Sequence, residues 1–317
     1  MEQRKTNTRT AGVDVSKRTL DVAVQGLEEM LKVSNTAAGL AELGRWLQAH
    51  DVGRVGLEAT GGYERELVWW LQAAGYEVVI HPPMAVRQYA RFKRLKAKND
   101  RIDAQLIALA TTQGEAIRAA LDPRLADLAE WMTAYEQITD HLACLKTEVE
   151  HVRLKPVRQI FAGLMRTLLR AKRALQDKIA CAIRACPDLA QRYDLLQSLP
   201  GVGKLVAAAL VIRMPELGSL ERGQAAALIG VAPFDRDSGL YRGQRRIWGG
   251  RERPRRFLYL AAVAAKRFDP SFKAFAARLC ARGKPTKLIT VAVMRKLIEA
   301  ANLVLGRGQP WTRALAT

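Results

Sequence analysis

The sequence predicts an α/β domain at the N-terminus, a long helical middle region and a mostly α-helical C-terminal domain. Three observations lead to this fold class. Short apolar runs with strand periodicity alternate with helical spacing up to about residue 120. Apolar residues then recur every three or four positions through a charged stretch. Beyond residue 194, glycine, proline and arginine become dense. We therefore expect three regions, residues 1–120, 121–194 and 195–317, for which 317 residues are sufficient.

The N-terminal region begins with the alternating segments TAGVDV and LDVAV around a turn at 16–18, which predict a strand hairpin. The spacing then predicts helices at Leu40–Leu47 and Leu67–Ala74, and strands at Val52–Leu57 and Glu77–Ile80. Strands that alternate with helices imply a partly parallel sheet covered by helices, and the leading hairpin makes that sheet mixed. This order of elements occurs in ribonuclease-H-like folds.

The middle region carries a long apolar seam at steps of three and four, typical of a coiled coil. Its members are Leu125, Leu128, Met132, Tyr135, Ile138, Leu142, Leu145, Val149 and Val152. Pro156 should break or kink this helix, and a returning helix should follow it. Two arrangements remain open here: a helical hairpin packed on its own chain, and a coiled coil between chains.

The chain is strongly basic, with 51 lysines and arginines against 31 acidic residues, a formal net charge of +20 and a pI near 10.2. A polyanionic partner is expected, because neutralising phosphates releases counterions. No apolar run reaches the roughly 18 residues needed to span a bilayer, and Met1–Thr10 lacks the apolar stretch of a signal peptide. We expect a cytoplasmic protein with no membrane partner. Its cysteines lack metal-ligand spacing and are expected to be reduced: Cys144, Cys181, Cys186 and Cys280.

Four carboxylates stand out by position. Asp14 interrupts the apolar alternation of the first strand, where burying a charge is costly without a cation. Glu58 closes an apolar strand, at the strand end where open α/β sheets place their sites. Asp100 and Asp103 share one face at the start of a predicted helix. Together they could hold one or two Mg²⁺ ions, which prefer oxygen ligands. Taken singly, Glu58 could be a surface strand end and Asp100 a helix N-cap.

The strings GVDVSK, LEATGGYE and KNDRIDA, at residues 12–17, 57–64 and 98–104, resemble the acidic motifs of the DEDD transposases of insertion-sequence family one-hundred-and-ten, relatives of pilin-gene invertases. LPGVGKLVAAAL at 199–210 and LIGVAPFDRDSGLYRGQRRIWGG at 228–250 resemble the second domain of that family. The resemblance covers nearly the whole chain. It implies a RuvC-like N-terminal domain, a C-terminal transposase domain, and Mg²⁺, with Mn²⁺ as a substitute ion, at the four carboxylates.

Three parts of the sequence are suited to binding phosphates. The turn at Gly201, Gly203 and Lys204 has the pattern of a helix-hairpin-helix, in which backbone N–H groups approach a phosphate, although a plain turn between helices would read the same. Basic residues crowd around Ser238: Arg236, Arg242, Arg245, Arg246, Arg251, Arg253, Arg255 and Arg256. A second basic run precedes Asp100 and includes Arg91, Lys93, Arg94 and Lys96.

Ser238 lies in the turn DSG, and a serine in such a turn is by itself no sign of catalysis. The resemblance implies that Ser238 attacks a DNA phosphodiester and forms a covalent phosphoserine link. It also implies donor and target DNA as substrates, a structured guide RNA, a homo-oligomer (dimer or tetramer), and action at the bacterial nucleoid. Whether the serine and the acidic site act in one chain or between subunits is not fixed by the sequence.

Two other functions remain open. One is a metal-dependent nuclease or Holliday-junction resolvase that uses water as its nucleophile, with Ser238 only structural. The other is a non-catalytic nucleic-acid-binding protein whose acidic residues bind no metal. A covalent protein–DNA adduct would separate the first from a recombinase, and Mg²⁺-independent binding without cleavage would indicate the second.

Overall fold

The computed structural model describes residues 9–92, 100–113, 122–234, 243 and 245–312, with the side chains of residues 83 and 100–102 excepted. The chain divides into two compact units, residues 1–123 and 124–317. Each unit has its own hydrophobic core, and the two are described separately.

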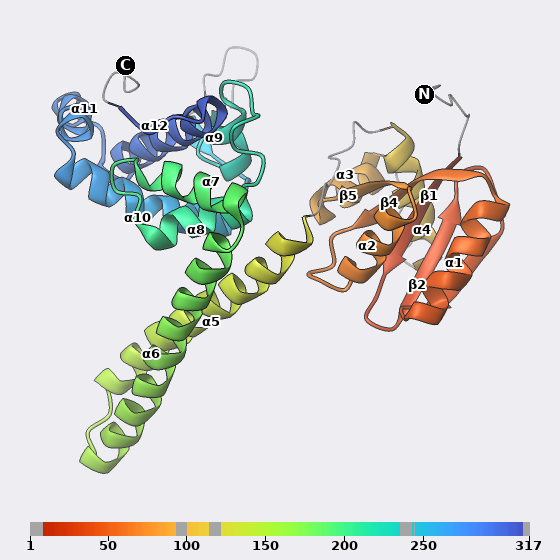
Figure 1. Ribbon diagram of the computed structural model, residues 1–317, viewed down its shortest axis with the longest axis horizontal. Helices are drawn as coiled ribbons and strands as arrows, with labels where there is room; N and C mark the ends of the chain where they lie inside the picture. The colour runs from red at the N-terminus through yellow and green to blue at the C-terminus, as the bar shows by residue number, and fades with distance from the viewer. Residues whose placement is uncertain (1–8, 93–99, 114–121, 235–242, 244, 313–317) are drawn as a thin grey trace. The chain divides into compact units, whose positions relative to one another are not determined.

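The first unit is built on a five-stranded mixed sheet (Figure 1). Its strands are β1 (Arg9–Val15), β2 (Thr19–Val24), β3 (Met30–Ser34), β4 (Val52–Glu58) and β5 (Glu77–His81). In the order β3-β2-β1-β4-β5, the first three strands pair antiparallel, while β1, β4 and β5 run parallel. The predicted hairpin and mixed sheet are thereby confirmed. The strand β3 was not predicted, because the edge segment MLKVS has only one fully buried residue.

Helices cover both faces of this sheet. On one face, α1 (Ala37–Ala49) and α2 (Arg65–Ala73) bury Leu43 and Leu67 against strand residues such as Val13 and Leu57. The opposite face of β1 and β4 is covered by α4 (Asp100–Gln113), which follows α3 (Pro83–Phe92). Since successive side chains of a strand point to opposite faces, Gly12 and Asp14 lie on the α4 side of β1, as Gly56 and Glu58 do on β4.

Two glycines allow α4 to lie close to the sheet. A Cβ atom on Gly12 would overlap the backbone of α4 at Ala104 O and Ala108 N. A Cβ atom on Gly56 would overlap the hydroxyl of Thr111, which is fully buried. Gly12 in β1 and Gly56 in β4 therefore provide the space that α4 occupies on this face of the sheet.

The second unit begins with a helical hairpin formed by α5 (Pro123–Glu150) and α6 (Lys155–Arg184), which extends away from the C-terminal helices (Figure 1). The predicted break is confirmed, since Pro156 lies in the first turn of α6. At the hairpin base, Leu128 and Met132 of α5 join Ile179 and Ile183 of α6 in the core of the C-terminal helices.

The rest of the second unit consists of helices that pack around that core and of a short, exposed strand pair. They are α7 (Pro187–Gln197), α8 (Lys204–Arg213), α9 (Gln224–Ile229), β6 (Pro233–Phe234), β7 (Arg246–Ile247), α10 (Glu252–Phe268), α11 (Pro270–Ala281) and α12 (Thr286–Arg307). The expected boundary at residue 194 lies within α7, whose Tyr193 and Leu196 are core residues. All four cysteines are free thiols. Within the described part of the chain, no helix is long and apolar enough to cross a bilayer.

Candidate active site

A row of polar residues crosses the sheet of the first unit, one from each strand. The strand pairing aligns Lys32 with Asp21, Asp21 with Asp14, and Glu58 with His81. Asp14 and Glu58 complete the row, because the residues before them, Val13 and Leu57, are partners in the parallel pairing of β1 with β4. All five side chains therefore project from the same face, with neighbouring strands about 4.8 Å apart.

The direction of α4 brings its N-terminal end toward this row. The Thr112 hydroxyl near its C-terminal end donates to Gln25 Oε1 at 2.7 Å, and Gln25 N donates to Thr10 O at the start of β1. Ala104 lies over Gly12, further along β1. The helix thus runs opposite to β1, and its first turn, with Asp103, points toward the end of β1 that carries Asp14.

The structure thus brings three of the four predicted carboxylates to one region. Asp14 and Glu58 are neighbours on the sheet, and Asp103 is partly buried on α4 above it. Asp100 is the first residue of α4, but its side chain lies outside the described residues. The donor set consists of carboxylates, which suits a hard divalent ion. Among the described side chains, no group of three or more His, Cys, Asp and Glu residues is close enough to hold a metal ion.

His81 ends the row on the side of β5. Its Nε2 atom lies 2.8 Å from the Thr111 hydroxyl on α4, so this contact joins the sheet edge to the helix. Burial lowers the pKa of His81, and the nearby charge of Arg54 lowers it further, so the imidazole is neutral at pH 7. Sequence reasoning missed His81, although it follows the apolar strand EVVI as Glu58 follows VGRVGL.

Asp21 is a fifth carboxylate in the row, also missed from the sequence. It faces Asp14 across the β1–β2 pair, and the repulsion between these like charges is offset by Lys32, whose Nζ lies 3.1 Å from Asp21. In the sequence, the position of Asp21 in LDVAV fits the ordinary alternation of a strand. The pairing of two acidic residues became visible only with the strand register.

The loop after Glu58 is held by hydrogen bonds. Glu64 Oε2 accepts from the Thr60 hydroxyl at 2.7 Å and from Gly62 N at 2.8 Å. Burial alone would raise the pKa of Glu64, but these hydrogen bonds outweigh it and the pKa is lowered. Asn35 Nδ2 donates to Tyr63 O in this loop and to Ser16 O after β1. The segments that follow Asp14 and Glu58 are therefore tied together at one edge of the sheet.

In the second unit, the predicted helix-hairpin-helix turn lies between α7 and α8. Gly201 has φ of +77° and packs directly on α10, where a Cβ atom would overlap Ala261 O. Gly203 caps α8, and no atom lies within 4 Å of the position a Cβ would occupy there. Lys204 is exposed in the first turn of α8. Gly201 is thus required by packing, whereas Gly203 and Lys204 present an open helix N-terminus.

The strand pair β6–β7 holds the two ends of the segment that contains Ser238. Phe234 pairs with Arg246, and Pro233 with Ile247. Ser238 itself lies outside the described residues, as do Arg236, Arg242, Lys93, Arg94 and Lys96. Among the described cations predicted to bind nucleic acid, the exposed ones include Arg91, Lys204, Arg245 and Arg246.

Other arginines that follow Ser238 in the sequence bind partners within the protein. Arg251 holds Glu216 Oε2 and the Arg213 carbonyl at 2.8 Å, and Arg255 donates to the carbonyl of Gly249 at 2.7 Å. These guanidiniums fasten the chain at the start of α10.

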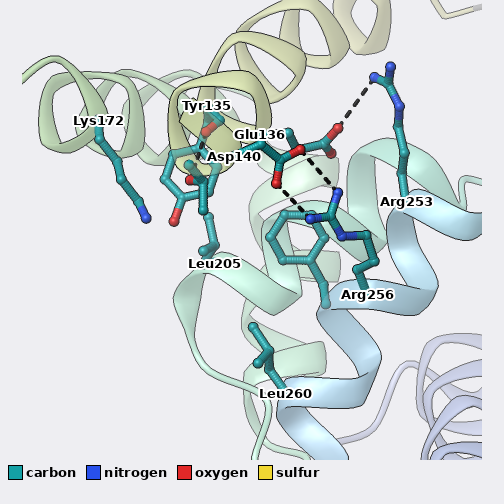
Figure 2. Close-up of a pocket in the computed structure, with 10 residues that line it drawn as sticks. Tyr135, Glu136, Asp140, Lys172, Leu205, Arg253, Arg256 and Leu260 are labelled. Carbon is teal, nitrogen blue, oxygen red and sulfur yellow. Dashed lines mark hydrogen bonds and ion pairs between the residues drawn. The ribbon is translucent and has the colours of Figure 1, made fainter. Parts of the chain in front are cut away.

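A pocket of about 290 Å³ lies at the hairpin base, between α5, α6, α8 and α10 (Figure 2). Arg256 binds Asp140 through contacts of 2.6 and 3.2 Å and holds the pKa of that carboxyl below its usual value. Arg253 lies 3.3 Å from Glu136, and Lys172 lies over the Tyr135 ring at 4.9 Å. The charges around the pocket are therefore largely compensated, and they hold the hairpin to α10.

Comparison with known proteins places these features in a family. Residues 11–154 match the DEDD transposase model of IS110, and residues 193–277 match the transposase model of the IS116/IS110/IS902 family. The pilin gene-inverting proteins of Moraxella bovis and Moraxella lacunata are each 27% identical over 319 residues, spanning 96% of this chain and 98% of theirs. A 43.6 kDa protein of insertion element IS110 from Streptomyces coelicolor is 29% identical over 139 residues, which is 43% of this chain and 33% of that protein. The chain belongs to the IS110 family of insertion-sequence transposases, enzymes that cut and rejoin DNA.

Proposed function

We propose that the first unit is a RuvC-like catalytic domain and that the chain recombines DNA by metal-assisted serine attack. The observation that supports the acidic site most directly is the adjacency of Asp14 and Glu58 on one sheet face, with the first turn of α4 directed toward them. Asp100 and Asp103 would complete the ligand set. Bound Mg²⁺, or Mn²⁺ in its place, would stabilise the charge that develops on the attacked phosphate.

The residues of the chain would carry the remaining steps. Ser238 Oγ would form an ester bond to the DNA phosphorus while the P–O bond to one strand end breaks. The departing oxygen would take up a proton from solvent, leaving that strand with a hydroxyl group. The proton of Ser238 would pass to solvent. Attack by the hydroxyl of a new strand would reverse the step and restore the serine, so no ATP is needed. Arg245 and Arg246, exposed at β7, would offset phosphate charge beside this segment.

The partners proposed are donor and target DNA and a structured guide RNA. A homo-oligomer, dimer or tetramer, is supported by exposed apolar residues on the outer part of α6, among them Ile160 and Leu164. Ser238 and the carboxylates lie in separate units, so they would meet within one chain or between subunits.

A covalent adduct tests this function. The full chain is purified with the RNA that accompanies it, that RNA is sequenced, and labelled DNA matching its loops is added with Mg²⁺. We expect a denaturant-resistant protein–DNA adduct that maps to the peptide containing Ser238. The variants Asp14→Asn and Ser238→Ala should both lose it while still binding nucleic acid.

Each alternative has its own signature in this assay. If Ser238→Ala cleaves at the wild-type rate, water is the nucleophile and the protein is a nuclease or resolvase. If Asp14→Asn forms the adduct normally, the acidic residues are not the metal site. If neither variant nor the wild type cleaves, with or without Mg²⁺, the protein only binds nucleic acid.

A further inference from the structure

The two arms of the helical hairpin have opposite charge. Helix α6 carries eight lysines and arginines against a single acidic residue, Asp177. Helix α5 carries six acidic residues against two cations, Arg124 and Lys146. The excess positive charge of this part of the chain is therefore concentrated on α6.

Three of the five arginines of α6 form a row on its outer side. Arg166, Arg170 and Arg173 are spaced four and three residues apart, which aligns them on one face. That face is roughly opposite to Ile179 and Ile183, through which α6 joins the core. We call Arg166, Arg170 and Arg173 the α6 arginine row. All three side chains are exposed to solvent.

Nothing in the described part of the chain neutralises this row. None of the three guanidiniums makes an ion pair or hydrogen bond there, in contrast to Arg184 at the helix end, which lies 3.5 Å from Asp194. Like charges at these spacings destabilise a helix. Repulsion within the row therefore destabilises α6 in the isolated protein, and a bound polyanion would reduce this repulsion.

We propose that the α6 arginine row binds the phosphate backbone of duplex DNA. This inference rests on the proposed function only for its substrate, because it requires a DNA-binding recombinase. With Lys155 at the start of α6, the basic face extends over about 27 Å along the helix, and duplex DNA carries a charge about every 1.7 Å of its axis. The one aromatic residue of α6, Phe161, is not fully exposed. A face without exposed aromatic rings suits a stacked duplex, since single strands are bound by stacking of their bases.

The experiment measures DNA affinity against salt concentration. Wild-type protein, a triple glutamine variant (Arg166→Gln, Arg170→Gln, Arg173→Gln) and a triple lysine variant at the same positions are titrated with a labelled 30-base-pair duplex in EDTA. Each lost phosphate contact reduces the slope of log affinity against log salt by about 0.9. Between 50 and 200 mM salt, the wild type should therefore lose roughly 40-fold more affinity than the glutamine variant. The lysine variant keeps the charge and should keep the wild-type slope.

Folding and alternative partners are controlled in the same experiment. The melting temperature of the glutamine variant should equal or exceed that of the wild type, because repulsion within α6 is removed. An unchanged salt slope in this variant, while the wild type binds DNA, overturns the inference and leaves the proposed function standing. Failure of the wild type to bind DNA would instead overturn the proposed function.

Two further results would reassign the row. If the glutamine variant binds duplex DNA normally but loses affinity for a structured RNA, the row is an RNA contact. If its mass in sedimentation falls to that of a smaller assembly while DNA binding per subunit is unchanged, the row contacts a second copy, for which the exposed Glu148 and Glu150 of α5 would be partners.

Discussion

The Nε2 atom of His81 donates a hydrogen bond to the hydroxyl oxygen of Thr111, at 2.8 Å. The donor is assigned by elimination, because the single hydroxyl proton of Thr111 is already directed at Ile107 O, 2.6 Å away. The hydrogen bond therefore assigns the proton of the neutral imidazole to Nε2, and the lowered pKa of His81 agrees with a neutral ring. This contact joins the last strand of the sheet to the helix that carries Asp100 and Asp103.

Replacement of His81 should loosen α4 on the sheet. In His81→Leu the Thr111 oxygen loses its donor, and we expect a loss of about 1 kcal/mol of stability together with a reduced cleavage rate. His81→Gln offers an amide N–H in a similar place and should recover most of both. Thermal unfolding and the rate of adduct formation measure the two effects. Equal rates in His81→Leu and the wild type would show that α4 is positioned without this contact.

The free energy of unfolding of the first unit should decrease as the pH is lowered through 6.5, the ordinary pKa of histidine. Because the folded-state pKa of His81 is lowered, the unfolded chain takes up a proton first as the pH falls, which favours unfolding. Well above pH 6.5, His81 is neutral in both the folded and the unfolded state and does not affect stability. Melting temperatures at pH 7.5 and 5.0 should therefore differ more for the wild type than for His81→Gln, which does not titrate. Parallel curves would contradict this.

A methyl group at Gly12 should displace α4. In Gly12→Ala the new Cβ would overlap the backbone at Ala104 and Ala108, which cannot turn aside as a side chain can. We expect destabilisation by roughly 1–3 kcal/mol and loss of cleavage. Gly163→Ala in α6 is the matched control: it has open space around its Cβ position and should raise stability by up to about 1 kcal/mol. Full activity in Gly12→Ala would show that cleavage does not depend on the close packing of α4 against Gly12.

Arg251 and Arg246 should respond in opposite ways to replacement by glutamine. Arg251 holds Glu216 and a backbone carbonyl, so Arg251→Gln should lower the melting temperature of the second unit. Arg246 is exposed, so Arg246→Gln should leave stability unchanged and weaken DNA binding in a salt-dependent way. Calorimetry and a binding titration on the two variants provide the comparison. Weaker DNA binding in a fully stable Arg251→Gln protein would instead show that Arg251 binds phosphate.

The exposed apolar side chains of α6 should contribute to subunit pairing. Ile160 is 71% exposed and Leu164 47% exposed, which is unfavourable for a single chain in water. The double variant Ile160→Gln, Leu164→Gln should lower the mass measured by sedimentation and leave the melting temperature of the C-terminal core unchanged. Leu142→Gln, at a buried position, is the contrast: it should lower stability. An unchanged mass in the double variant would favour a hairpin that needs no partner.

The first unit was largely predictable because its strands alternate cleanly and its acidic residues interrupt that alternation. The polar row was not predictable as a whole. Asp21 becomes a neighbour of Asp14 only through the strand register, and His81 a neighbour of Glu58 only because β4 and β5 pair in parallel. Strand order is set by non-local packing, which local periodicity does not encode.

In the second unit, the apolar seam predicted the helices but not which residues they pack against. Leu128 and Tyr135 have the same spacing as outer seam residues, yet they are buried in the C-terminal core. The density of arginine near Ser238 likewise does not distinguish arginines that bind nucleic acid from arginines that form contacts within the protein. Arg251, Arg255 and Arg256 are fixed by Glu216, the Gly230 carbonyl and Asp140, partners that lie at least 25 residues away in the sequence.

The hairpin also has a property of length. Between residues 143 and 174, no side chain is fully buried, so the outer arms contribute nothing to the core that holds their base. Deleting seven residues, about two turns, from each arm would bring the hairpin tip about 10 Å closer to the C-terminal core. The faces of α5 and α6 that contact each other would stay aligned. The number of turns in the hairpin therefore sets the distance between its tip and the C-terminal core, because the outer turns add length without adding buried side chains.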